Sequence, residues 1–304
     1  MLFKNARVYR ITRPLDRYSI ESALQEHPAR ECQAIESSTA GWNSPAAHNG
    51  PLVHRQMEID MLRLTTYTKV LPAAIVNRMT DEYVRKIEQE QARVVRKRER
   101  LGIKDNVIAE LLPTALQQCR DTYAYIDYAR QLLIINCASK GEAEKFCTAL
   151  RQALGSLPVT PLTTSASPGA TMTHWLLHQS EPYGIEIEGD AVLSLPAEGG
   201  TEKATLKNHD LHSQEVAGHL EAHKQVERLR INWQNKISAT IDADMTIKSI
   251  RFSDIIAEKI ADINADDHAE RFAADAAIMT DELGELLADL VSAFGGYQVE
   301  QEAA

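Results

Sequence analysis

The segment Pro72–Leu101 has the pattern of one long helix, and it constrains the fold more than any other feature of the sequence. Its proline suits a first helical position, and Gly102 is placed to end the helix. Such a helix would be about 45 Å long at about 1.5 Å per residue. β-rich segments lie on either side of it, at 59–70 and 122–138. The sequence therefore predicts a helical arm, residues 72–118, inserted into a sheet.

The far end of this predicted helix is strongly basic. Its cations recur at the spacing i, i+4, i+7, i+11, which places them in one narrow stripe. The stripe is Arg93, Lys97, Arg100 and Lys104, with Arg96 beside it. Like charges at this spacing repel, and a bound polyanion would cancel the repulsion. The alternative is a solvated helix face that only keeps the protein soluble.

Charge is distributed unevenly along the chain. The 304 residues carry a formal net charge of −10, whereas residues 93–104 hold six basic residues and one acidic residue, Glu99. A local basic face can bind nucleic acid while the acidic remainder keeps the protein soluble. Binding through lysine and arginine alone depends on phosphates and is nearly blind to sequence. The residues expected to meet DNA are Arg93, Arg96, Lys97, Arg100 and Lys104.

The rest of the chain predicts an α+β protein with mixed or antiparallel sheets. At 44% hydrophobic and 25% charged residues, the composition is that of an ordinary globular protein. We find no internal repeat and no regular alternation of strands and helices. The strongest linker signal is Thr163–Ala170. We therefore expect an N-terminal α/β sheet domain (1–71 and 119–165), the inserted helical arm (72–118) and a C-terminal α+β domain (166–304).

Local patterns predict the elements of these parts. In the N-terminal half they are a strand in 1–11, a helix in 19–27, an irregular stretch at 28–58, a strand in 59–70, a second arm helix over 105–112 ended by Pro113, a hairpin in 122–138 and a helix in 141–154. In the C-terminal half they are a helix at 173–178, a weak strand at 185–195, a loop at 197–201, a hairpin or meander over 229–252 and an acidic amphipathic helix or helix pair over 272–294. The apolar face of that last helix could be buried against a second copy of the chain.

No motif for catalysis or for a cofactor is present. The sequence lacks GxxxxGK[ST], GxSxG and GxGxxG, so we expect neither an enzyme nor a bound cofactor. A zinc site usually adds a cysteine or carboxylate in a defined frame, and two aspartates in a tight turn more often form the turn. We therefore expect no metal site at the candidate residues His209, His212, His219, His223, Asp242 and Asp244.

Cysteine usage and hydropathy point to a cytoplasmic protein. The four cysteines show no CxxC pair or metal-binding spacing, which is typical of a reducing compartment. No apolar run approaches the roughly 18 residues that a membrane span needs, and the N-terminus lacks a signal-peptide core.

Several short motifs occur in a fixed order along essentially the full length of the chain. They are Met1–Asn5 (MLFKN), Leu71-Pro72, the basic run ending at Lys104-Asp105, Leu111-Leu112-Pro113-x-Ala115, Asn136–Ser139 (NCAS), Leu154–Pro161 (LGSLPVTP), Arg271-Phe272-x-x-Asp275 and Gly295-Gly296. Each is weak alone, but their order and spacing together resemble the bacterial recombination-associated RdgC family.

That resemblance implies a homodimer closed into a ring, with duplex DNA passing through a positively charged hole. It also implies binding independent of sequence, association with the nucleoid, and competition with the RecA recombinase that limits recombination. Leu116 stands where the family typically has a phenylalanine, and we expect it at the arm tip as a dimer contact. The alternative is that Leu116 is an ordinary core residue. The chain also departs from the family pattern at Thr114, where an arginine is common, and at Ala273, where an aspartate is usual.

Two other functions are compatible with the sequence. One is an acidic protein-interaction scaffold whose basic helix pairs with an acidic partner, and salt-dependent retention of DNA would separate it from a DNA-binding protein. The other is a metal-dependent nuclease built on Asp242 and Asp244.

Overall fold

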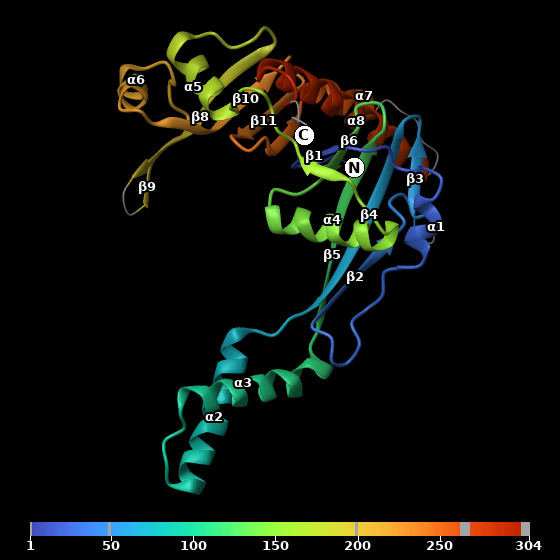
Figure 1. Cartoon of the computed structure of the whole chain (residues 1–304), viewed down its shortest axis with the longest axis vertical. Helices are drawn as coiled ribbons and strands as arrows, with labels where there is room; N and C mark the ends of the chain where they lie inside the picture. The colour runs from blue at the N-terminus through green and yellow to red at the C-terminus, as the bar shows by residue number, and fades with distance from the viewer. Residues whose placement is uncertain (1, 48–49, 198–199, 262–267, 299–304) are drawn as a thin grey trace, which may run out of the picture.

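The computed structural model describes residues 2–47, 50–197, 200–261 and 268–298. They form two antiparallel sheets with helices packed against them, and a helical hairpin projects from the ends of two long strands (Figure 1). The predicted α+β class with antiparallel sheets is confirmed.

The first sheet has the strand order β2–β4–β5–β6–β1–β7, and β3 also pairs with β4. Its two long strands, β4 and β5, pair along their full length. Helices α1 and α4 cover one face, where they share a core with the strands. The elements are β1 (Arg7–Ile11), α1 (Ile20–Gln25), β2 (Ser38–Asn43), β3 (Val53–Gln56), β4 (Ile59–Lys69), β5 (Gln117–Asp127), β6 (Leu132–Ile135), α4 (Lys140–Leu154) and β7 (Val159–Pro161).

The second sheet has the order β12–β11–β10–β8–β9. The predicted meander over 229–252 is confirmed as β10, β11 and β12, and a backbone bridge between Ala6 and Ile247 links this sheet to the N-terminal segment. The elements are α5 (Pro168–His178), β8 (Ile185–Ala197), β9 (Gly200–Leu206), α6 (Gln214–Glu221), β10 (Gln225–Trp233), β11 (Ile237–Asp242), β12 (Ile247–Phe252), α7 (Asp254–Ala261) and α8 (His268–Ala293).

Helix α8 packs against both sheets and joins them into one large core. The ring of Phe272 meets the His54 ring of β3 edge to face, and the Trp233 indole of β10 donates to the Asp289 carboxylate at 2.8 Å. The expectation that the apolar face of this helix is buried against a second copy is wrong, because the face is used inside the chain. Its large apolar residues are at most 5% exposed: Phe272, Met279, Leu283, Leu286, Leu287 and Leu290. The division into domains at 165/166 stays a prediction, although the two halves share this core.

The predicted single helix Pro72–Leu101 is wrong. The chain forms α2 (Ala73–Gln91) and α3 (Lys97–Leu111) with a turn between them, and a short 3-10 helix, Leu112–Thr114, follows. Gly102 lies inside α3 and does not end a helix, whereas the predicted stop near Pro113 is confirmed.

Side-chain contacts explain the break between the two helices. Ala92 adopts the left-handed conformation (φ 49°), and the Glu88 carboxylate accepts the Val95 backbone N–H at 2.9 Å. Folding back buries Val84 of α2 and Val107 of α3, which would lie far apart on one straight helix. Burial of apolar side chains favours the hairpin over a solvated single helix.

The conformation of Ala92 gives a prediction whose sign separates the two structures. Within a continuous helix, Ala92→Gly would destabilise by about 1 kcal/mol. In the hairpin, glycine relieves the left-handed strain at this position, so the variant should be neutral or more stable by up to about 1 kcal/mol. Hydrogen exchange of the α2 and α3 amides measures the difference. Faster exchange in the variant would contradict the hairpin.

Two strands, β2 and β3, lie in the stretch 28–58 that was expected to be irregular, and β9 begins at Gly200, within the expected loop 197–201. Gly41 lies inside β2. A Cβ atom at Gly41 would stand 2.4 Å from the Pro28 carbonyl oxygen, so glycine is needed where segment 27–29 runs parallel to the strand. Backbone hydrogen bonds on both sides of Trp42, to His27 and from Ala29, fix this approach.

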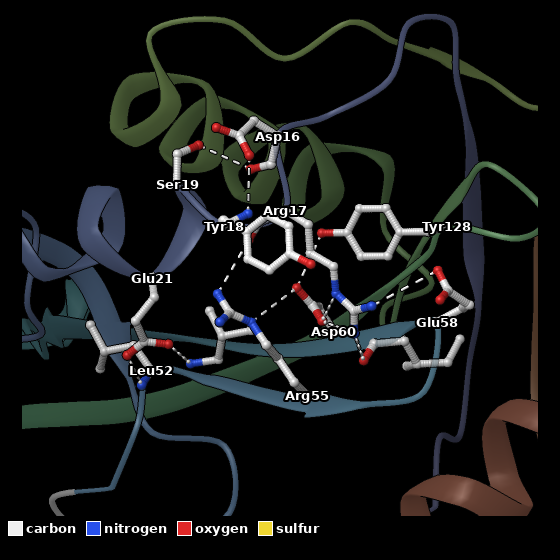
Figure 2. A network of polar contacts seen from close by, with 12 residues as sticks. Asp16, Arg17, Tyr18, Ser19, Glu21, Leu52, Arg55, Glu58, Asp60 and Tyr128 are labelled. Atoms are coloured by element: carbon white, nitrogen blue, oxygen red, sulfur yellow. Dashed lines mark hydrogen bonds and ion pairs between the residues drawn. The ribbon is translucent and has the colours of Figure 1, made fainter.

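A buried carboxylate ties the N-terminal segment to the first sheet (Figure 2). The Asp60 side chain, on β4, is 0% exposed. Arg17 donates to it at 2.9 Å, the Tyr128 hydroxyl donates at 3.1 Å, and the Arg55 guanidinium lies 3.7 Å away. The Arg17 guanidinium also stacks over the Tyr128 ring. A buried charge is tolerated when it is paired and hydrogen-bonded, as this one is.

Candidate nucleic-acid interface

The predicted DNA-binding residues lie in the outer part of the α2–α3 hairpin, which projects away from both sheets (Figure 1). Arg93 is in the turn, Arg96 immediately precedes α3, and the other three cations lie on α3. The expected single stripe is therefore wrong in its geometry. Only Lys97, Arg100 and Lys104, at spacing i, i+3, i+7, share one side of a helix.

Two of these cations form ion pairs with carboxylates of the hairpin. The Arg93 guanidinium donates to both Glu99 carboxylate oxygens, at 2.7 and 2.6 Å, and Arg100 pairs with Asp81 of α2. The hydrogen bond to Glu99 raises the pKa of Arg93, and the same bond lowers the pKa of Glu99. Both pairs are exposed, so they contribute little stability. They nevertheless engage Arg93 and Arg100, which the sequence pattern predicts to contact phosphates.

The remaining cations are free to bind an anion. Arg96 and Lys97 are exposed and Lys104 is half-buried; within the described ranges none of the three forms an ion pair. Arg98 is also exposed and unpaired there, although the stripe pattern passed over it. On α2, the exposed Arg85 and Lys86 join the same hairpin once the chain folds back. The sequence did not predict this turn, because the turn contains neither glycine nor proline.

The first turn of α3 suits an anion as well. Arg96 precedes the helix in an extended conformation and its own side chain makes no capping hydrogen bond, although Glu99 places a carboxylate in the first turn. Unpaired N–H groups and the helix dipole make such a terminus favourable for negative charge. Arg96, Lys97 and Arg98 outnumber the single Glu99 carboxylate, so the start of α3 is net positive.

Leu116 lies where the hairpin joins β5, not at its outer turn. It is 82% exposed, so the alternative that it is a core residue is wrong. The Val70 N–H donates to the Leu116 carbonyl, and Val70 borders an apolar groove of about 160 Å³ that is also lined by Leu71, Pro72, Ile75, Val76, Leu111, Thr114 and Ala115. Ile35, at 84% exposure, lies on the nearby loop that Lys69 fixes through the Gln33 and Ala34 carbonyls.

The basic residues of the second sheet are not a comparable surface, since carboxylates of the same sheet or of α8 neutralise most of them. The pairs are Arg228 with Asp242, Arg230 with Glu188, Lys236 with Glu282 and Lys248 with Asp242.

The candidate metal-binding residues do not converge. Asp242 pairs with Lys248, and Asp244 pairs with Arg7 at 3.2 Å. Burial raises the pKa of Asp242, while Lys248 opposes that shift. His209 contacts Glu215, and His223 lies beyond α6. In the part of the chain that the structure describes, no three potential ligands lie close enough to share a metal ion.

None of the described helices has the length and hydropathy to cross a bilayer.

Comparison with known proteins gives matches along nearly the whole chain. The family model described as "Putative exonuclease, RdgC" matches residues 1–297. A protein named recombination-associated protein RdgC, from Tolumonas auensis, is 36% identical over 303 residues, covering 99% of this chain and 100% of that protein. Proteins of the same name from Psychromonas ingrahamii and Yersinia enterocolitica are 35% and 33% identical, covering 98% and 97% of this chain and 99% and 98% of their own lengths.

Proposed function

Since this chain belongs to the RdgC family, we propose that it is a non-enzymatic protein that binds duplex DNA without regard to sequence, encircles it as a ring-shaped homodimer and limits RecA-mediated recombination. The name that the relatives carry supports a role in recombination. Such a protein would act at the nucleoid in the cytoplasm.

One observation carries the DNA-binding part of the proposal. The projecting hairpin concentrates exposed cations that have no carboxylate partner among the described residues, while most cations of the second sheet are paired. Arg96, Lys97 and Arg98 lie at the N-terminus of α3, where the N-cap side chain makes no hydrogen bond and backbone N–H groups add to the side-chain charge. Phosphate contacts of this kind position a protein but carry no base information.

The direct test is binding of the full chain to two unrelated duplexes across a range of salt concentrations. Each phosphate neutralised should contribute about −0.9 to the slope of log K against log salt. We expect a slope of several units that is the same for both duplexes. Binding that is absent, or that is retained only by an acidic protein, would favour the scaffold interpretation.

The surface at the root of the hairpin supports a homodimer. An exposed leucine beside an apolar groove suits a two-fold contact in which Leu116 of each copy enters the groove of the other. Such a two-fold contact is the common form of a soluble homodimer. Two hairpins brought together at their roots would present their cations to one duplex.

Leu116→Ser should weaken the dimer without unfolding the chain. A leucine gains about 1.5–3 kcal/mol when it is fully buried, and a two-fold interface contains the leucine twice, so the dissociation constant should rise at least about tenfold. Sedimentation velocity measures the change. Leu177→Ser, on α5 and 43% exposed, is the matched control. Equal dissociation constants for the two variants would mean that Leu116 is not part of the interface.

The proposal treats the protein as non-enzymatic, although the matching family model carries the word exonuclease. Ion pairs occupy both Asp242 and Asp244, the carboxylates of the nuclease alternative. Incubation of end-labelled duplex with the protein and magnesium separates the two. Degradation that is lost in Asp242→Asn would overturn this part of the proposal.

A further inference from the structure

A second, larger pocket lies at the opposite end of the molecule from the hairpin. It has a volume of about 550 Å³ and is bounded by the β3–β4 turn, the β5–β6 turn and one side of α8. In Figure 1, α8 and these turns lie at the end of the first sheet remote from α2 and α3. None of the contacts described above for DNA or for the dimer uses this pocket.

The charge left available in this pocket is negative. Its single guanidinium, Arg130, is already paired with Asp127 at 3.0 Å and lies flat against Gly284, where an added Cβ would stand 2.7 Å from it. Asp281 is exposed and forms no ion pair with any residue in the described ranges. Glu58 is 67% exposed, and its ion pair with Arg17 is long, at 3.8 Å. An occupant of the pocket therefore meets two exposed carboxylates, of which one has no ion pair among the described residues and the other has only a long one.

The rest of the lining is apolar. Met57 is 89% exposed at the rim, held outward by a turn in which its own φ is 49°. Ile59 and Ile278 are half-buried in the walls. A methionine at the edge of an apolar site adapts to different partner shapes. The combination fits an aliphatic side chain flanked by cations.

The chain itself carries such a segment. At the hairpin turn, Val94 is 80% exposed and is flanked by Arg93 on one side and by Arg96 and Lys97 shortly after it. The α2–α3 turn and the elements that line the pocket lie at opposite ends of one chain (Figure 1), so the turn and the pocket can meet only between two copies.

We propose that, in the absence of DNA, the hairpin turn of one copy docks in the α8 pocket of another, with Val94 as the apolar anchor and Arg96 and Lys97 facing Asp281 and Glu58. The contact joins two different surfaces, so it extends assembly beyond a two-fold dimer. DNA and the pocket would use the same cations, so DNA should dissociate this contact, and that expectation rests on the proposed function. The self-association does not rest on it.

Sedimentation velocity of the full chain without DNA tests the contact. We expect species larger than a dimer at about 0.05 M salt and their loss at about 0.5 M, where exposed charges are screened. Asp281→Lys places like charges opposite each other and should weaken the larger assembly at least about tenfold. Met57→Asn, which tolerates the left-handed conformation, should weaken it too. Glu186→Lys changes the net charge equally at an exposed site outside the pocket, and it should have no effect.

Three results would overturn the proposal. The wild-type chain could form no species larger than a dimer at low salt. Asp281→Lys could form as much of the larger species as the wild type, or Glu186→Lys could lose as much of it as Asp281→Lys. Adding duplex DNA to the wild type then addresses the proposed function separately. If the larger species persist with DNA and no DNA is bound, the DNA-binding proposal fails while the docking contact stands.

Discussion

The double variant Arg96→Glu, Lys97→Glu should bind duplex DNA at least about tenfold more weakly than the wild type near 0.1 M salt, and equally so for unrelated sequences. Both side chains are exposed and, among the described residues, unpaired, so their reversal removes phosphate contacts without breaking an ion pair. The slope of log K against log salt should become shallower by about 0.9 for each phosphate that the variant no longer neutralises. Fluorescence anisotropy with labelled duplexes measures both quantities.

The matched control is Lys145→Glu with Arg151→Glu, which makes the same charge change at exposed positions of α4. It should alter affinity only slightly, because these residues lie outside the hairpin. Equal losses of affinity in both double variants would mean that net charge alone matters. Unchanged affinity and slope in the folded Arg96/Lys97 variant would mean that the hairpin is a solvated surface that does not bind DNA. Arg100 is the poorer target, since its reversal would place a carboxylate against Asp81.

Asp60→Ala should lower the free energy of unfolding by about 3–5 kcal/mol, the range for breaking a buried charge pair from one side. The Asp60 carboxylate is fully buried and accepts from both Arg17 and Tyr128. Its removal leaves a partly buried guanidinium and a hydroxyl without their acceptor, in the segment that leads into α1. Urea denaturation monitored by circular dichroism gives the difference.

An exposed ion pair provides the comparison. Glu82→Ala removes the partner of Arg78 on α2, where both side chains are at least 60% exposed, and it should cost no more than about 1 kcal/mol. Asp60→Asn keeps the side-chain volume and one acceptor and should fall between the two. A destabilisation by Asp60→Ala as small as that by Glu82→Ala would mean that the network in Figure 2 does not anchor the N-terminal segment.

Local patterns were sufficient where a residue's partners lie close in sequence or repeat regularly. The alternation of Leu229, Ile231 and Trp233 predicted β10, and all three side chains are buried as the pattern requires. The apolar spacing of the C-terminal segment predicted α8 in the same way. The pattern could not show what the apolar face of α8 packs against, because either a second copy or the chain's own sheets could bury it.

The hairpin shows why the rest was out of reach. Its turn depends on a left-handed Ala92 and on carboxylates that act across several residues, such as Glu88 on Val95, and neither has a short sequence signature. The spacing rule grouped Arg93 and Arg100 with the phosphate-binding residues, but the folded hairpin gives each an acidic partner. It passed over Arg98 because that residue is off the stripe of an ideal straight helix. The assignment of the remaining cations to DNA stays a prediction.

Encirclement is the central claim, and a topological measurement tests it most directly. The full chain is bound to a linear duplex, the ends are ligated with the protein in place, and the DNA is washed at about 1 M salt, where electrostatic contacts are screened to about 3 Å. A closed ring should stay on the sealed circle and leave an unligated linear duplex by sliding off its ends. Equal release from both forms would contradict encirclement and leave a protein that binds DNA only through its exposed charges.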